Sequence, residues 1–199
     1  MKKLLLLFFV FSVYKASAQL PDYGLYNIHI SDSVKSIRTQ VVPVSGIVTA
    51  YPSLLYYWYG SNLIHEQQGG FSGKLLNGTY EEYDKNHHLT IQGGFKNGLK
   101  NGIWKIWNGS GFLTSVVTWD EGVKAGKFAY YNLTGKETEA GIYANDQLNG
   151  KIIYHTGTDS VKTIIYKAGK AVPPKNGSFL KRINIFRKKS EKTLPVQSQ

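Results

Sequence analysis

Large hydrophobic residues recur through the middle of the chain at a spacing of 24 residues. Four glycines set the period, and each is followed at the second position by a large hydrophobic residue and at the fifth by an aromatic residue or a histidine. The glycines are Gly78, Gly102, Gly126 and Gly150; the second-position residues are Tyr80, Trp104, Phe128 and Ile152; the fifth-position residues are Tyr83, Trp107, Tyr131 and His155. Three positions that recur together at the same spacing do not arise by chance, and a fixed period of this length is typical of repeat architectures.

Each unit has the pattern of a β-hairpin. In the third unit, Leu113, Val117 and Trp119 fall on one face of a strand, because side chains alternate between the two faces. Asn108-Gly109 stands between the two apolar runs of that unit and is a strong signal for a two-residue hairpin turn. The second-position and fifth-position residues differ in parity, so they should point to opposite faces of the sheet unless a bulge intervenes.

Stacking of these hairpins predicts the fold. A lone hairpin cannot bury its aromatic face, whereas stacked hairpins bury one another's. The same register extends backwards to a unit in which Leu54 replaces the glycine. We therefore expect an all-β fold, an elongated antiparallel sheet of five stacked hairpins over residues 54–77, 78–101, 102–125, 126–149 and 150–171. Residues 19–53 hold two apolar runs, Tyr26–Ile30 and Val41–Val48, and either could form a strand that caps the first hairpin.

The repeated phrase resembles the MORN repeat, in the variant form of bacterial proteins often catalogued as a YwqK-type antitoxin family. The resemblance rests on the glycine, the two hydrophobic positions after it and the Asn/Asp-Gly turn before the next glycine, and it covers about residues 54–171. It implies a twisted sheet of stacked hairpins and a scaffold or interaction role, and its motifs say little about activity. The last unit departs from the pattern, since Tyr166 arrives one place early and His155 replaces an aromatic residue, as expected of a capping repeat.

The first eighteen residues have the three-part pattern of a secretory signal peptide. Lys2 and Lys3 precede an apolar run over residues 4–13, and Ala16-Ser17-Ala18 supplies the small residues of a cleavage site. A run of about ten apolar residues is too short to cross a hydrocarbon core of ~30 Å. We therefore expect an exported protein, periplasmic or secreted, with no transmembrane segment after signal cleavage. Export also argues against a cytoplasmic antitoxin role.

The positive charge of the chain is concentrated in a basic tail, residues 172–199. This tail contributes +6 of the formal net charge of +11. Its bases include Lys181, Arg182, Arg187, Lys188 and Lys189, which flank apolar residues, and such a segment can settle on anionic lipid head groups. We expect either peripheral contact with an anionic membrane surface through these five residues or a solvated tail that aids solubility. Nucleic acid is not an expected partner, because an exported protein seldom meets it.

Residues that carry chemistry do not form a recognisable catalytic or metal site. The chain has no cysteine, which excludes disulfides, thiolate zinc sites and iron–sulfur ligation. His87 and His88 are adjacent, so in a strand they would point opposite ways and could not share a metal ion. Ser110 lies in Asn-Gly-Ser-Gly, which is better interpreted as a hairpin tip than as a nucleophile elbow. We therefore expect no enzyme activity, no cofactor and no metal.

Aromatic side chains on the second face of the sheet are the candidate binding surface. One face can form the core, whereas a second aromatic face needs a partner or a cover. The residues we select as partner-binding are Trp58, Tyr83, Trp107 and Tyr131. Cross-strand ring ladders that stiffen the sheet are the structural alternative for these residues.

The function we expect is a non-enzymatic, exported interaction scaffold that binds a protein partner or an envelope glycan. Two alternatives stay open. The first is a hydrolase acting on an envelope polymer, which a cleft joining His87 or His155 to a carboxylate would favour. The second is an immunity or antitoxin-like protein that neutralises an exported toxin.

Overall fold

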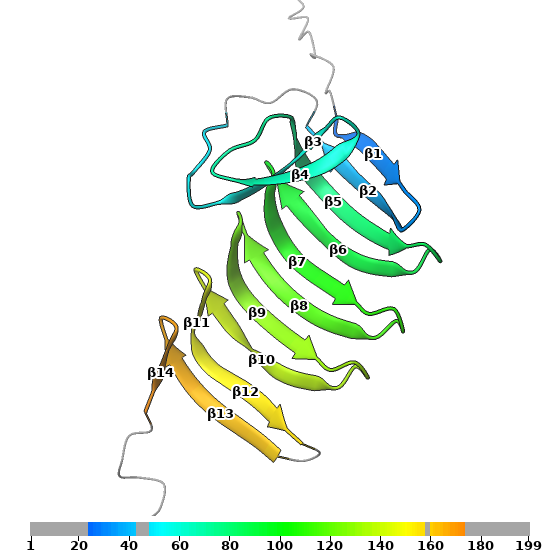
Figure 1. Ribbon diagram of the computed structural model, residues 1–199. Coiled ribbons are helices and arrows are strands. Elements are labelled where there is room, and N and C mark those ends of the chain that lie inside the picture. Colours follow the sequence, from blue (N-terminus) through cyan, green and yellow to red (C-terminus); the bar gives the residue numbers. More distant parts are fainter. Residues whose placement is uncertain (1–23, 43–47, 158–159, 174–199) are drawn as a thin grey trace, which may run out of the picture.

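The computed structural model describes residues 24–42, 48–157 and 160–173. These residues form an all-β protein without helix: one long antiparallel sheet of sequential hairpins that does not close into a barrel (Figure 1). The strands are β1 (Tyr26–Ser31), β2 (Lys35–Val41), β3 (Leu55–Gly60), β4 (Leu63–Gln68), β5 (Lys74–Asp84), β6 (Leu89–Lys96), β7 (Leu99–Trp107), β8 (Leu113–Asp120), β9 (Val123–Tyr131), β10 (Glu137–Ala144), β11 (Gln147–Leu148), β12 (Gly150–Thr156), β13 (Ser160–Lys167) and β14 (Lys170–Val172). The main path of paired strands is β1-β2-β5-β6-β7-β8-β9-β10-β12-β13-β14. The predicted fold class is confirmed.

Two kinds of turn alternate along the sheet. At one edge, β6–β7, β8–β9 and β10–β11 are joined by two-residue turns in which both central residues have positive φ, as type I′ turns require. These central pairs are Asn97-Gly98, Glu121-Gly122 and Asn145-Asp146. Because such turns twist in the same sense as the strands, they join neighbouring strands without splaying them.

The turns at the opposite edge are longer and share a side-chain cap. Asn108 Oδ1 accepts hydrogen bonds from the backbone N–H groups of Ser110 and Phe112, both at 3.0 Å. Asp84 and Asn132 occupy the corresponding positions, 24 residues away on either side, and accept equivalent pairs of bonds. The expected two-residue Asn108-Gly109 turn is therefore wrong: residues 108–112 separate β7 from β8, and the Asn108 N–H donates to the Phe112 carbonyl, which leaves three residues between that pair. The side chain of Asn108 caps this wider turn.

The four glycines of the 24-residue period lie at irregularities within the ladder. Gly126, for example, has φ of 106° and lies where the pairing of β8 with β9 shifts register, between Trp119–Lys124 and Val117–Phe128. Gly78, Gly102 and Gly150 also have positive φ, at 88°, 78° and 77°. Residues other than glycine are strained in this conformation, which gives the period its physical basis.

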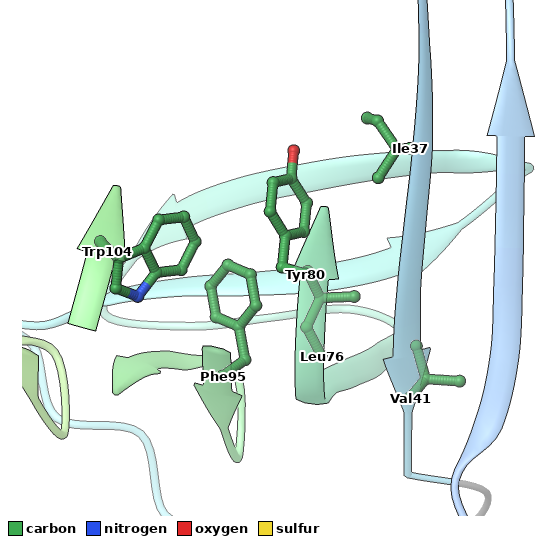
Figure 2. Packing of buried hydrophobic residues seen from close by; sticks show 6 residues of the cluster. All are labelled: Ile37, Val41, Leu76, Tyr80, Phe95 and Trp104. Carbon is green, nitrogen blue, oxygen red and sulfur yellow. The ribbon is translucent and has the colours of Figure 1, made fainter. Parts of the chain in front are cut away.

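The second-position residues form the core on one face of the sheet, which we call the ring face. Tyr80, Trp104, Phe128 and Ile152 are 9%, 6%, 3% and 0% exposed. Figure 2 shows the first part of this core, where Tyr80, Phe95 and Trp104 pack against Ile37, Val41 and Leu76. A Cβ atom at Gly93 would collide with the Trp104 ring, so the glycine makes room for the indole. The fifth-position residues lie on the opposite face, the outer face, as their parity predicts.

The N-terminal part of the fold differs from the expected stack. The β3–β4 hairpin, within residues 54–77, does not stack in line with the others; it pairs with β5 only at Trp58–Leu75 and Tyr59–Lys74 and crosses the ring face (Figure 1). The place beside the rest of β5 is taken by β2. Residues Leu76–Asp84 of β5 are hydrogen-bonded to β2, whereas Lys74 and Leu75 pair with β3. The two parts of β5 therefore direct the β1–β2 and β3–β4 hairpins apart. The strand expected over Val41–Val48 is instead Lys35–Val41, and residues 43–47 lie outside the described part of the chain.

Candidate functional site

A cavity of about 340 Å³ lies between the β3–β4 hairpin and the ring face. This volume is at the small end of the range for small-molecule sites. Its aromatic walls come from Tyr57, Tyr80, Phe95 and Trp104, and its charged groups from Asp32, Lys35, Glu66 and Lys100. The hairpin supplies one side and β1, β2, β5, β6 and β7 supply the other, so the cavity exists because β3–β4 crosses the sheet.

Two carboxylates, Glu82 beside the cavity and Glu66 in its wall, each have a tyrosine hydroxyl as a neighbour. The Tyr80 hydroxyl donates to Glu82 Oε2 at 2.9 Å, and Lys35 Nζ donates to the same oxygen at 3.1 Å. On the hairpin side, Tyr57 lies opposite Glu66 in the β3–β4 ladder, and the carboxylate acts on its hydroxyl. Burial raises the pKa of both phenols, and the neighbouring carboxylates raise it further, so Tyr57 and Tyr80 remain protonated donors at neutral pH.

Lys100 brings a largely buried ammonium group to the same place. Its Nζ lies 4.5 Å from the centre of the Trp104 ring, 5.1 Å from Trp119 and 5.3 Å from Tyr57. Burial lowers the pKa of Lys100, and the charge of Glu66 partly offsets this. Within the described residues, the ammonium forms no ion pair and no hydrogen bond, so its three N–H donors are available to a ligand.

Lys100 begins a row of alternating rings and ammonium groups along the ring face. Lys124, 24 residues further on, has its Nζ 5.7 Å from the Trp119 ring and 5.2 Å from the Tyr143 ring. Trp119 therefore has one lysine from each neighbouring strand over its ring. Such cation–π contacts contribute about 0.5–1 kcal/mol each where exposed and more where desolvated.

Beyond this row the ring face is lined with tyrosine hydroxyls. Tyr130 and Tyr143 approach within 3.4 Å through their hydroxyl oxygens, and Tyr154 and Tyr166 within 3.1 Å. All four rings are half-buried, and they cover Phe128 and Ile152 from the side. Burial raises the pKa of Glu139, which lies opposite Tyr154 in the ladder, and Tyr154 partly offsets this. The described chain places no second layer over this part of the face.

Trp58, one of the predicted partner-binding residues, takes part in the packing between β5 and the β3–β4 hairpin, which we call the cover hairpin. Its ring stacks on His65 with 4.2 Å between centroids, and its Nε1 is buried without a hydrogen-bond partner among the described residues. It packs against a small core formed by Tyr56, Leu75 and Leu99. Trp58 thus lies apart from the other three predicted residues and fits the structural alternative.

The remaining three predicted residues lie on the outer face near the capped turns. Tyr83 and Trp107 both border a shallow hollow near the strand ends, which ring-face residues such as Lys35 and Ile91 also line, whereas Tyr131 belongs to the next hairpin. The Tyr83 hydroxyl donates to Glu81 at 2.7 Å, and the Arg38 guanidinium lies 5.3 Å from its ring centre. These three rings are half-buried and do not converge on a single point.

Two histidine–carboxylate pairs are present on the described surface. His155 Nε2 lies 3.2 Å from Glu137 Oε1, and His88 Nδ1 lies 3.2 Å from Asp84 Oδ2. Neither pair lies in the cavity under β3–β4. The described residues contain no group of three or more histidines and acids placed to hold a metal ion.

The five predicted surface-association residues, Lys181, Arg182, Arg187, Lys188 and Lys189, lie outside the described residues, as does the signal peptide. Residues 24–42, 48–157 and 160–173 include no helix that is long and apolar enough to span a membrane.

The sequence analysis did not identify the lysines of the ring face or the cavity. Lys100 and Lys124 occupy the same position in the turn phrases before Gly102 and Gly126, so their 24-residue spacing could have marked them. Glu66 has no such signal, because its position depends on the departure of β3–β4 from the stack.

Comparisons with known proteins identify no family. No family model matches the chain, and no significant match is found among the curated proteins.

Proposed function

We propose that this chain is an exported, non-enzymatic repeat protein of the MORN type that acts as an interaction scaffold, and that its ring face binds a segment of a partner protein. The observation that supports the proposal is an incomplete second layer. The β3–β4 hairpin packs over the first part of the ring face, while over β8–β13 the half-buried rings have no cover from the described residues. A partner segment would cover the rings of β8–β13, as the β3–β4 hairpin covers the rings at the other end of the sheet.

The charges of this face favour a partner segment that carries both apolar and acidic side chains. The ammonium of Lys124 lies among the rings without a carboxylate from the described chain. Lys162 is exposed and pairs with Tyr154 in the ladder, on the same face. Glu139 lies on the same face, so two positive charges stand against one carboxylate there among the residues named. Acidic groups placed beside each lysine would gain charge-assisted hydrogen bonds, and apolar side chains between them would cover the rings.

Site-specific photo-crosslinking tests this proposal. A photoreactive residue is placed at Lys124, on the ring face, or at Lys127, three residues along the same strand on the outer face. The two full-length variants are expressed in the native host and irradiated in intact cells. We expect a discrete protein adduct from position 124 that is absent from position 127, and we expect mass spectrometry to place the crosslink in an acidic segment. Adducts from position 127 alone, or from neither position, would contradict the assignment of the binding face.

The hydrolase alternative has one observation in its favour, the His155–Glu137 pair. A general base needs a partner and a cleft that holds substrate. The two side chains of the pair are 31% and 38% exposed and lie outside the cavity. The binding role therefore accounts for more of the described surface.

A further inference from the structure

The cavity under the β3–β4 hairpin is a second site, separate from the open part of the ring face. We propose that it binds a carbohydrate of the size of a mono- or disaccharide, or the end of a longer glycan. This goes beyond the proposed scaffold function and does not depend on it, since the cavity and the open face are formed by different strands.

The hydrogen-bonding groups of the cavity favour hydroxyl-rich ligands. Lys100 offers three N–H donors that no described residue uses. Glu66 and Asp32 line the cavity and supply carboxylate acceptors, while Lys35, which also lines it, is paired with Glu82 beside the cavity. A sugar hydroxyl is both donor and acceptor, so neighbouring hydroxyls can satisfy an ammonium and a carboxylate at the same time.

The charge balance argues against an ionic ligand. The lysines that line the cavity, Lys35 and Lys100, are balanced by Glu66 and Asp32, which also line it, and by Glu82 beside it. Lys35 is paired with Glu82, and Asp32 accepts two backbone N–H groups in its own turn. A strongly anionic ligand would meet Glu66, and a cationic ligand would meet Lys100. A neutral ligand avoids both repulsions, and in this respect a sugar fits better than a phosphate or an amine.

The apolar walls suit the carbon faces of a sugar ring. Ile37, Ile64 and Ile91 line the cavity together with the edges of the aromatic rings. A sugar presents polar hydroxyls around its rim and C–H groups on its faces, so it can contact both kinds of wall. The cavity volume of about 340 Å³ limits the occupant to a small sugar or a chain end.

Tryptophan fluorescence and titration calorimetry on the purified full chain test the proposal. The probes are glucose, galactose, mannose, N-acetylglucosamine and its β-linked dimer, with leucine and glycyl-leucine as zwitterionic comparisons. Trp104 lines the cavity and reports occupancy. We expect saturable binding of at least one sugar and no binding of the amino acid or dipeptide. Absence of binding by every sugar at tens of millimolar, or binding of leucine in place of sugars, would overturn the proposal.

Two matched pairs of variants locate the bound sugar. Lys100→Met keeps the aliphatic stem and removes the ammonium, whereas Lys124→Met makes the same change at the equivalent position outside the cavity. Glu66→Gln and Glu139→Gln form a second pair on the same principle. We expect Lys100→Met and Glu66→Gln each to weaken sugar binding about tenfold, as loss of a hydrogen bond to a charged group does. Lys124→Met and Glu139→Gln should leave it unchanged, and an equal loss in both members of a pair would refute the site.

Failure of one proposal can be told from failure of the other. Lys124 is the crosslinking position for the partner protein and the unaffected control for sugar binding. A chain that binds sugar but gives no crosslink at position 124 would retain the cavity site and lose the scaffold assignment. If Lys100→Met does not fold, Glu66→Gln on the exposed hairpin strand carries the test alone, because it keeps the size of the side chain.

Discussion

The Lys100 ammonium lies 4.5 Å from the centre of the Trp104 ring, four residues further along the same strand. Lysine and indole are separated by the irregularity at Gly102, whose positive φ bends β7 between them. The contact between Lys100 and Trp104 thus joins the core, in which Trp104 is buried, to the cavity, where the ammonium of Lys100 can bind a ligand. The same irregularity between Lys124 and Phe128, around Gly126, continues the pattern over the open part of the face.

Trp58→Ala and Trp107→Ala should differ in their effect on stability. Trp58 lies in the β3–β4 hairpin, stacks on His65 and packs against the buried cluster of Tyr56, Leu75 and Leu99. Its removal therefore leaves a cavity, and we expect a loss of about 3 kcal/mol in the free energy of unfolding. Trp107 is half-buried near a turn on the outer face, and its loss should cost about 1 kcal/mol or less. Urea denaturation measures both. Equal losses would show that Trp107 is as much a core residue as Trp58.

Gly126→Ala should destabilise the fold through its backbone. The residue has φ of 106°, and an added Cβ would also lie 3.2 Å from the Thr118 side chain. We expect a loss of about 1–3 kcal/mol in the free energy of unfolding. Gly109→Ala is the matched control, because nothing lies within 4 Å of a Cβ there and φ is not positive. It should be neutral or stabilising by up to about 1 kcal/mol. A neutral Gly126→Ala would contradict the role assigned to the 24-residue glycines.

Stability should fall steeply in alkaline solution because of the buried phenols. The pKa of Tyr80 is raised in the fold, chiefly by burial and then by Glu82, above its ordinary value of 10.0. Folding therefore favours the protonated phenol, and this contribution is complete below pH 10 and is lost as the pH rises above it. Lys100 acts in the opposite direction, since its lowered pKa makes folding more favourable as the pH rises toward 10.5. Tyr57, Tyr143 and Tyr154 share the raised pKa of Tyr80, so the phenols dominate.

Tyr80→Phe isolates one of these phenols. The free energy of unfolding, measured by urea denaturation at intervals between pH 9 and 12, should decline less steeply in the variant than in the parent chain. The difference in slope should approach about 1.4 kcal/mol per pH unit, the value for one proton. Parallel curves would show that Tyr80 ionises equally easily in the folded and unfolded chain.

Leu6→Arg should block export. The residue lies in the apolar run of the predicted signal peptide, and an arginine there interrupts the short apolar core that such peptides need. Fractionation of cells that express the full chain should find the parent protein outside the cytoplasm, shortened by about eighteen residues. The variant should stay in the cytoplasm at full length. If the parent chain is found in the cytoplasm with its first eighteen residues still attached, the prediction of export is contradicted.

The sequence predicted the fold class, and it predicted that second-position and fifth-position residues point to opposite faces, because both follow from local periodicity; it did not decide which face is buried. A glycine, a large residue two places later and alternation along the strand were sufficient to place Tyr80, Trp104 and Phe128 on one face. The cover hairpin could not be predicted in this way. Its direction depends on how β5 divides its hydrogen bonds between β2 and β3, which is a contact between distant segments.

The candidate site was less predictable than the fold for the same reason. The aromatic residues were selected as the second face of a uniform stack of hairpins, and the stack is not uniform at its N-terminal end. Trp58 there packs against a buried cluster of the β3–β4 region. Glu66 lines a cavity whose position cannot be derived from the 24-residue period. Lys100 and Lys124 were visible in the repeat, but their contacts with Trp119 depend on the irregularities at the glycines.

The most direct test of the central claim compares capture of partners from the native envelope by four forms of the protein. These are the full chain, a chain that ends at Pro173, a ring-face variant (Tyr143→Ser with Tyr154→Ser) and an outer-face variant (Tyr83→Ser with Tyr131→Ser). Each is checked for folding and then crosslinked under identical salt. We expect the same partner to be captured by the full chain, the shortened chain and the outer-face variant, and to be lost from the ring-face variant. Capture that disappears with the tail, or with the outer-face tyrosines while the ring-face variant still binds, would contradict the claim.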